Sequence, residues 1–171
     1  MEKLALKDIF ARMIAHKAEQ PAAEEPQVKD AAVLIVDDSR TIVRALQLIL
    51  ERAGYLTYSA TDGIQAISLA RRQRPDAILM DVVMPIMNGF EATRILVNDP
   101  QTAAIPVIMM SGTEQLSDRI WGTRLGAKGF IAKPFAKDDL LAKLGSVIAV
   151  ARRAQEQTQI SVPSPTEPLP R

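Results

Sequence analysis

The sequence predicts an α/β fold built on an open, parallel β-sheet. Five short apolar runs alternate with five segments of helical periodicity, and glycine or proline separates many of them. The runs are apolar at nearly every position, which is typical of strands that helices cover on both faces. Because a helix connects each strand to the next, right-handed crossovers place all five strands parallel in one sheet.

Local start and stop signals set the bounds of these elements. Ser39 and Asp62 can cap the first and second helices of this domain, while Gly54 and Gly126 follow the ends of the first and fourth. The expected strands are 33–36, 55–60, 76–81, 105–110 and 129–133. The expected helices are 41–53, 63–74, 90–98, 114–125 and a long helix from Asp138.

The α/β domain, expected over residues 31–150, lies between segments of different composition. Residues 1–19 carry apolar side chains at helical spacing and predict an amphipathic N-terminal helix. Residues 20–30 lack periodicity, contain two prolines and predict a flexible linker, and residues 155–171, with four prolines, predict a disordered tail. The apolar stripe of the N-terminal segment comprises Leu6, Ile9, Phe10, Met13 and Ile14.

Composition excludes several classes of protein. The chain of 171 residues has no cysteine, which rules out disulfides and thiolate metal sites. Its net charge is +1 without a basic run, so a nucleic-acid surface is not favoured. No apolar stretch reaches the length of a membrane span, and the N-terminus lacks the pattern of a signal peptide. We therefore expect a cytoplasmic protein that does not insert into membranes.

Polar side chains stand at the carboxyl ends of four of the five predicted strands: Asp37 and Asp38, then Asp81, Ser111 and Lys133. Each alone has an ordinary explanation as a helix cap, a turn or a surface loop. Together they would meet at the carboxyl edge of a parallel sheet, where ligands of such sheets bind. Clustered carboxylates suit a hard cation such as Mg²⁺. A carboxylate beside a cation can attack phosphorus, and a lysine and a hydroxyl can bind the phosphoryl oxygens.

Four short motifs in this order resemble the receiver domain of response regulators, of the chemotaxis-regulator type. They are 35–39 (IVDDS), 80–89 (MDVVMPIMNG), 110–112 (MSG) and 133–135 (KPF). The resemblance spans about residues 31–150 and implies a flavodoxin-like (βα)5 fold. This is a three-layer sandwich whose five-stranded parallel sheet has the order 2-1-3-4-5.

The resemblance also implies residue roles. Asp81 would be the phosphoacceptor. Mg²⁺ would be held by Asp37, Asp38, Asp81 and the backbone carbonyl of Val83. Lys133 would pair with the phosphoryl group and precede a cis peptide bond to Pro134.

The remaining implied roles concern the switch between states. Ser111 would move to bond the phosphoryl group, Phe130 would change rotamer with it, and Gly112 would leave room for the phosphoryl donor. The face of the fourth helix, fifth strand and fifth helix would then bind a downstream protein. Trp121 on that fourth helix could anchor such a partner, or could equally pack between helices.

The expected function is a stand-alone response regulator of a two-component phosphorelay, phosphorylated by a sensor histidine kinase. It would catalyse only its own phosphoryl transfer and dephosphorylation. Further matches at 88–94, 99–100, 105–108 and 121–122 resemble the PilH-like regulators of twitching motility, which suggests control of type IV pili or chemotaxis-like motility. The alternatives are a phosphorylation-independent pseudo-receiver that binds proteins and a flavin-binding or phosphatase enzyme. A polar residue at position 83 could position a water that hydrolyses the phosphoryl group. Because Val83 is apolar, we expect slow self-dephosphorylation.

Overall fold

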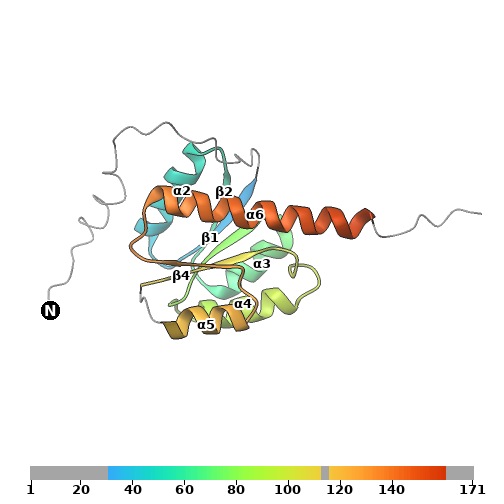
Figure 1. Ribbon diagram of the computed structural model, residues 1–171. Helices are drawn as coiled ribbons and strands as arrows, with labels where there is room; N and C mark the ends of the chain where they lie inside the picture. Colours follow the sequence, from blue (N-terminus) through green and yellow to red (C-terminus); the bar gives the residue numbers. More distant parts are fainter. Residues whose placement is uncertain (1–30, 113–115, 161–171) are drawn as a thin grey trace, which may run out of the picture.

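A computed structural model of the protein describes residues 31–112 and 116–160. The predicted N-terminal helix, the linker and residues 161–171 lie outside the described part. One parallel sheet organises what is described, with strand order β2-β1-β3-β4-β5 (Figure 1). Both the α/β class and the order 2-1-3-4-5 are therefore confirmed. The strands are β1 (Ala32–Val36), β2 (Leu56–Ala60), β3 (Ala77–Asp81), β4 (Val107–Ser111) and β5 (Gly129–Ala132).

Helices cover both faces of the sheet. Helices α2 and α6 lie over one face, and α3, α4 and α5 lie over the other (Figure 1). Most bounds differ from the predicted ones by only one or two residues, which is the usual uncertainty of element ends. The helices are α2 (Arg40–Arg52), α3 (Gly63–Gln73), α4 (Gly89–Asn98), α5 (Leu116–Arg124) and α6 (Lys137–Ile160).

The strand residues divide between two buried clusters because successive side chains of a strand point to opposite faces. Ile35 belongs to the same buried cluster as Leu46 of α2 and Leu144 of α6, whereas its neighbour Leu34 belongs to the cluster that includes Leu96 of α4. All five are completely buried. Burying such a side chain stabilises the fold by roughly 1.5–3 kcal/mol. The double-sided core explains why the strands are apolar throughout.

Helix caps fix the segments that follow the strands. As predicted, Ser39 caps α2 and Asp62 caps α3, each accepting a backbone N–H from the first turn. Asn88 and Glu91 form a reciprocal capping box at the start of α4. Because these caps lie just beyond the carboxyl ends of β1, β2 and β3, they hold the loops around that edge in place.

The final helix is longer than predicted. α6 continues to Ile160, so the prediction that the disordered tail begins at residue 155 is wrong. Gln155, Glu156 and Gln157 favour helices, and no proline occurs between Pro134 and Pro163. As a result α6 projects well past the sheet (Figure 1). None of the described helices has the length and apolar composition needed to cross a membrane.

Candidate functional site

Three carboxylates meet at the carboxyl edge of the sheet. Asp37 and Asp38 follow β1, and Asp81 is the last residue of the neighbouring strand β3. One oxygen of each carboxylate lies within 4.8 Å of the other two. Asp37 and Asp81 are buried, at 1% and 7% exposure, whereas Asp38 is exposed. The cluster is therefore open to solvent on the side of Asp38.

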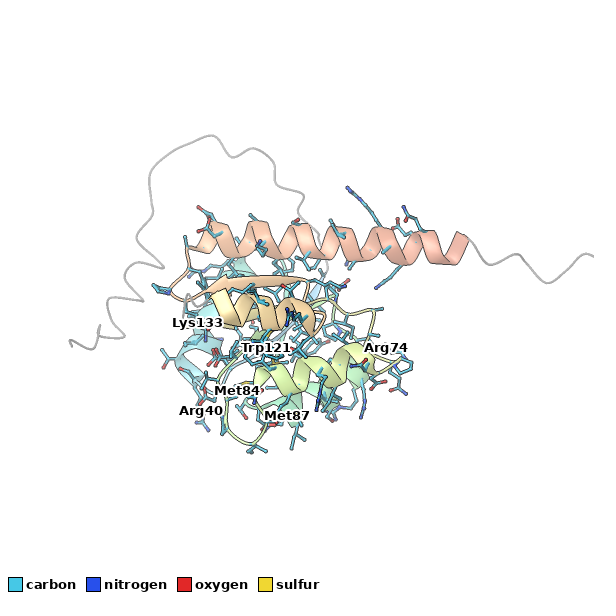
Figure 2. All side chains as sticks on the ribbon, turned by 60° about the horizontal axis from the view of Figure 1, so that its bottom comes forward. Arg40, Arg74, Met84, Met87, Trp121 and Lys133 are labelled. Carbon is cyan, nitrogen blue, oxygen red and sulfur yellow. The ribbon has the colours of Figure 1, made fainter. Side chains whose placement is uncertain are left out.

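Lys133 joins two of these carboxylates. Its Nζ donates to Oδ2 of Asp37 at 2.6 Å and to Oδ1 of Asp81 at 2.8 Å. Lys133 follows β5, two strands away from β3, so only a long side chain can reach both acids. The predicted cis peptide bond between Lys133 and Pro134 is confirmed. Figure 2 shows Lys133 toward the same end of the molecule as Arg40, with Arg74 toward the other end.

Asp37 is held by further hydrogen bonds. Its Oδ1 accepts the N–H of Ser39 at 2.9 Å, and its own N–H donates to the carbonyl of Ala60 at 3.1 Å. Since its Oδ2 accepts from Lys133, both carboxylate oxygens have partners. Asp37 is thus fixed in orientation, while Asp38 faces solvent beside it.

Ser111 and Gly112 lie at the carboxyl end of β4, and Phe130 lies within the neighbouring strand β5. Ser111 ends β4 and is buried, and its carbonyl accepts the N–H of Lys133 at 2.6 Å. A Cβ added at Gly112 would meet no heavy atom within 4 Å among the described residues. Phe130, on β5 opposite Met109, is half-buried against the core under α3 and α4. Ser111 and Gly112 therefore lie at the same edge as the acids, whereas Phe130 lies two residues before the end of β5.

The segment after Asp81 is packed more tightly than the sequence indicated. The N–H of Val82 donates to the carbonyl of Met110 at 2.9 Å, and the N–H of Gly89 donates to the carbonyl of Val82 at 3.0 Å. A Cβ at Gly89 would overlap the carbonyl oxygen of Asp81. In the sequence Gly89 is only the last residue of the motif 80–89, and nothing there indicated this contact. Val83, by contrast, is 77% exposed.

Burial opposes the charge on Asp81. It raises the pKa of this carboxyl above the ordinary 3.8, an effect that Lys133 partly offsets and that Asp37 and Asp38 reinforce. Burial also acts to lower the pKa of Lys133, but the hydrogen bonds to Asp37 and Asp81 outweigh it and raise that pKa above 10.5.

The residues fit a divalent cation. Three carboxylates face one ammonium group, which leaves two negative charges uncompensated, equal to the charge of one Mg²⁺. Oxygen ligands, with the remaining positions filled by water, suit this ion, and the exposed Asp38 marks the open side. The net charge of the cluster and its oxygen ligands thus both suit Mg²⁺.

Trp121 lies on the outer surface of α5. Its side chain is 58% exposed, so it is not enclosed between neighbouring helices (Figure 2). This position agrees with the first of its two predicted roles, a partner contact, whose occurrence stays a prediction.

Comparison with known proteins agrees with this geometry. A sequence model of the response regulator receiver domain matches residues 33–145. The chain is 44% identical to Protein PilH of Pseudomonas aeruginosa over 119 residues, which are 70% of this chain and 98% of PilH.

Solved structures of receiver domains are also similar. The chemotaxis response regulator CheY4 of Vibrio cholerae is 35% identical with a TM-score of 0.66, covering 70% of this chain and 99% of that one. The receiver domain of sensor histidine kinase PA1611 from Pseudomonas aeruginosa is 32% identical with a TM-score of 0.66, covering 70% and 98%. Its structure has a magnesium ion coordinated in the active site cleft.

Some relatives are much longer than this chain. The response regulator PleD of Caulobacter vibrioides is 40% identical over 117 residues, which are 68% of this chain but only 26% of PleD. The similarity to such proteins concerns one domain of theirs, so their other activities do not transfer.

Proposed function

Because the chain belongs to the family of response regulator receiver domains, we propose that Asp81 accepts a phosphoryl group from the phosphohistidine of a sensor histidine kinase. One observation carries this proposal: three carboxylates converge at one sheet edge with a lysine bonded to two of them. Burying several like charges without a counter-ion lowers the stability of the folded protein. The site is best explained by a cation and an anion that complete it.

The metal site we propose consists of Asp37, Asp38, Asp81 and the backbone carbonyl of Val83. A bound Mg²⁺ would neutralise these carboxylates and the oxygens of the incoming phosphoryl group. Ser39 and Ala60 hold Asp37 in position through the hydrogen bonds at 2.9 and 3.1 Å. Asp38 is exposed and can approach an ion with little rearrangement.

In the reaction, a carboxylate oxygen of Asp81 attacks phosphorus as the bond from phosphorus to the histidine nitrogen breaks, and that nitrogen keeps the electron pair. Lys133 already bonds Oδ1 of Asp81 at 2.8 Å, so its ammonium group needs only a small shift to reach a phosphoryl oxygen. Gly112 leaves the approach to the site open. Apart from this transfer, the chain would catalyse only the hydrolysis of its own acyl phosphate.

We propose that the signal leaves through Ser111 and Phe130. The Ser111 hydroxyl would bond the new phosphoryl oxygen, and Phe130 would turn into the space that Ser111 vacates. The face of α5, β5 and α6 would change with it and bind a downstream protein, with Trp121 as a contact. Phosphorylation would bias a pre-existing pair of conformations.

The pathway we propose is control of type IV pili or of chemotaxis-like motility. The similarity to PilH, which covers 98% of that protein at 44% identity, supports this assignment. We place this role in the cytoplasm, where a histidine kinase would present its phosphohistidine.

The test is incubation of the full chain with Mg²⁺ and acetyl phosphate, followed by intact mass. We expect one added phosphoryl group, lost in Asp81→Asn and on chelation of Mg²⁺. Asp99→Asn is the matched control, since Asp99 lies at the far end of α4 and pairs with Arg71. Failure of the unmodified chain to gain mass would overturn the proposal in favour of a phosphorylation-independent pseudo-receiver.

A further inference from the structure

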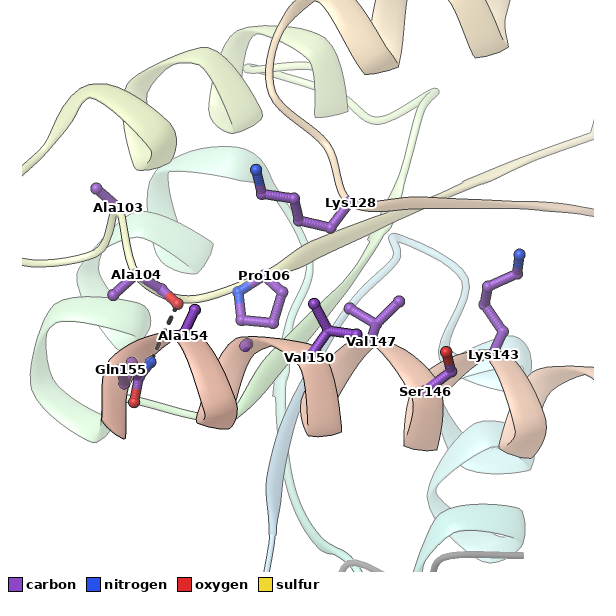
Figure 3. A pocket seen from close by; sticks show the side chains of 11 residues that line it. Ala103, Ala104, Pro106, Lys128, Lys143, Ser146, Val147, Val150, Ala154 and Gln155 are labelled. Carbon is purple, nitrogen blue, oxygen red and sulfur yellow. Dashed lines mark hydrogen bonds between the residues drawn. The ribbon is translucent and has the colours of Figure 1, made fainter. Parts of the chain in front are cut away.

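An apolar groove lies at the edge of the sheet opposite the site. It has a volume of about 880 Å³. Pro106 and the loop before it form one wall, and Val147, Val150 and Ala154 of α6 form the other (Figure 3). Val150 is 64% exposed, so its side chain presents apolar surface in this groove. A hydrogen bond from Gln155 to the carbonyl of Ala104 at 3.3 Å closes one end.

The groove depends on a part of the chain that the family model does not reach. That match ends at residue 145, whereas five apolar or small groove residues of α6 lie between 146 and 154. The N-terminal residues before 33 also lie outside the match. Two extensions beyond the family pattern therefore occur in one chain: a longer last helix and a preceding segment with its own apolar stripe.

The start of the described chain is linked to α6, the helix that forms one wall of this groove. The N–H of Ala32 donates to Oδ2 of Asp76 at 2.8 Å, and Arg152 of α6 donates to Oδ1 of the same carboxylate at 2.7 Å. One carboxylate thus connects the start of β1 with the helix that forms the groove. The eleven linker residues 20–30 can extend to roughly 36 Å, so the segment before them can reach any part of the groove.

The charge of the linker complements the rim of the groove. Lys128 and Lys143 line the groove beside its apolar wall, and none of the described lining residues is acidic. In the linker, Glu24, Glu25 and Asp30 outnumber its one lysine. An acidic linker that runs past a basic rim gains favourable electrostatic interaction, although such exposed contacts are individually weak.

We propose that the N-terminal segment, residues 1–19, docks in this groove of its own chain. Its stripe of Leu6, Ile9, Phe10, Met13 and Ile14 has the helical spacing that lets one face cover an apolar groove. Docking removes the exposed Val150 from water and ties the N-terminal extension to α6. It does not depend on phosphorylation, because the groove and the phosphoryl site lie at opposite edges of the sheet.

The test uses the absence of cysteine. Lys17→Cys is introduced in the full chain, a nitroxide spin label is attached, and amide signals of residues 146–155 are recorded by NMR. We expect these signals to lose most of their intensity at high dilution, and to regain it in Val150→Glu and in Phe10→Glu. Ile64→Glu is the matched control, since Ile64 is 54% exposed on α3, away from the groove, and should leave the loss unchanged.

Other occupants give different results, and each overturns the proposal. Unbroadened groove signals in the otherwise unsubstituted labelled chain would show that the segment does not dock. Broadening that appears only when spin-labelled chains are mixed with separate isotope-labelled chains would assign the groove to a second copy. Shifts of the groove signals on removal of residues 161–171, without effect of Phe10→Glu, would assign it to the C-terminal tail.

Discussion

The carboxyl and amino edges of the sheet differ in how their charged side chains are balanced. At the carboxyl edge, Lys133 and three acids crowd together and two of the acids are buried. At the amino edge, Asp76 satisfies the start of β1 and pairs with Arg152, with both side chains partly exposed. One edge accumulates uncompensated negative charge and the other balances it. This contrast shows where the fold carries a site and where charge only supports structure.

The two edges should therefore respond differently when their charged side chains are replaced. Ionised Asp81 is disfavoured in the folded protein because burial raises its pKa. The pair of Asp76 and Arg152 lies nearer to solvent and needs no ligand to compensate it. Substitutions at the two edges should therefore separate site chemistry from fold stability.

The largest effect is expected for Lys133→Met. It leaves the buried carboxylates of Asp37 and Asp81 without their ammonium partner, and should lower the free energy of unfolding by about 3 kcal/mol without Mg²⁺. Lys143→Met, on the exposed rim of the groove, should change it by less than about 0.5 kcal/mol. Urea denaturation of both variants measures this, and equal effects would erase the distinction between the edges.

A glycine pair tests the packing of the carboxyl edge. Gly89→Ala would force a Cβ against the carbonyl of Asp81 and should cost about 1–3 kcal/mol, with loss of phosphoryl acceptance. Gly112→Ala meets no described atom and should leave the unfolding free energy nearly unchanged. Thermal unfolding and intact mass after acetyl phosphate treatment report the two effects. A fully stable, phosphorylatable Gly89→Ala variant would refute the close approach.

Asp81→Asn should stabilise the metal-free protein at neutral pH, because it removes a charge that burial disfavours. Because the folded pKa of Asp81 is raised, the folded protein holds this proton more tightly than the unfolded chain does. The stability that the proton contributes is present at low pH and is lost as pH rises through the folded pKa, above the ordinary 3.8.

The difference in unfolding free energy between Asp81→Asn and the unsubstituted protein should thus grow from about pH 4 upward, in the presence of a chelator. Denaturation over a pH series measures it. Asp76→Asn is the control at the opposite edge and should destabilise, since it weakens the pair with Arg152. A difference that shrinks with rising pH would show that folding lowers the pKa of Asp81 rather than raises it.

The smallest structural effect is expected for Val83→Asn. Val83 is 77% exposed, so the substitution should change the unfolding free energy by less than about 0.5 kcal/mol. A polar side chain there can position a water on the acyl phosphate, and should speed its decay. Decay of the phosphorylated mass with time measures the rate, and rapid loss from the unsubstituted protein with no gain in the variant would remove the proposed role of Val83.

Sequence reasoning reached the fold and the site through the strands. Apolar runs ending in Asp37, Asp81, Ser111 and Lys133 determine both the layers and the edge at which these side chains meet, because parallel strands end together. The roles of these residues stay predictions. The strand order itself came from the resemblance to receiver domains, since alternation alone leaves several orders open.

Other features depend on three-dimensional contacts that no local pattern carries. The close approach of Gly89 to Asp81 requires the packing of α4 against the end of β3. The groove beside Val150 requires the full length of α6, which the sequence-based prediction ended too early because prolines further on suggested a tail. The bond of Lys133 to both acids depends on which strands become neighbours.

The most direct measurement locates the phosphoryl group. After phosphorylation with acetyl phosphate and Mg²⁺, borohydride reduction converts an aspartyl phosphate to homoserine, which tandem mass spectrometry assigns to one position. The account predicts homoserine at residue 81 alone, dependent on Mg²⁺. Homoserine at Asp37, Asp38 or Asp76, or none at all, would contradict the claim that the carboxyl edge is a phosphoryl site centred on Asp81.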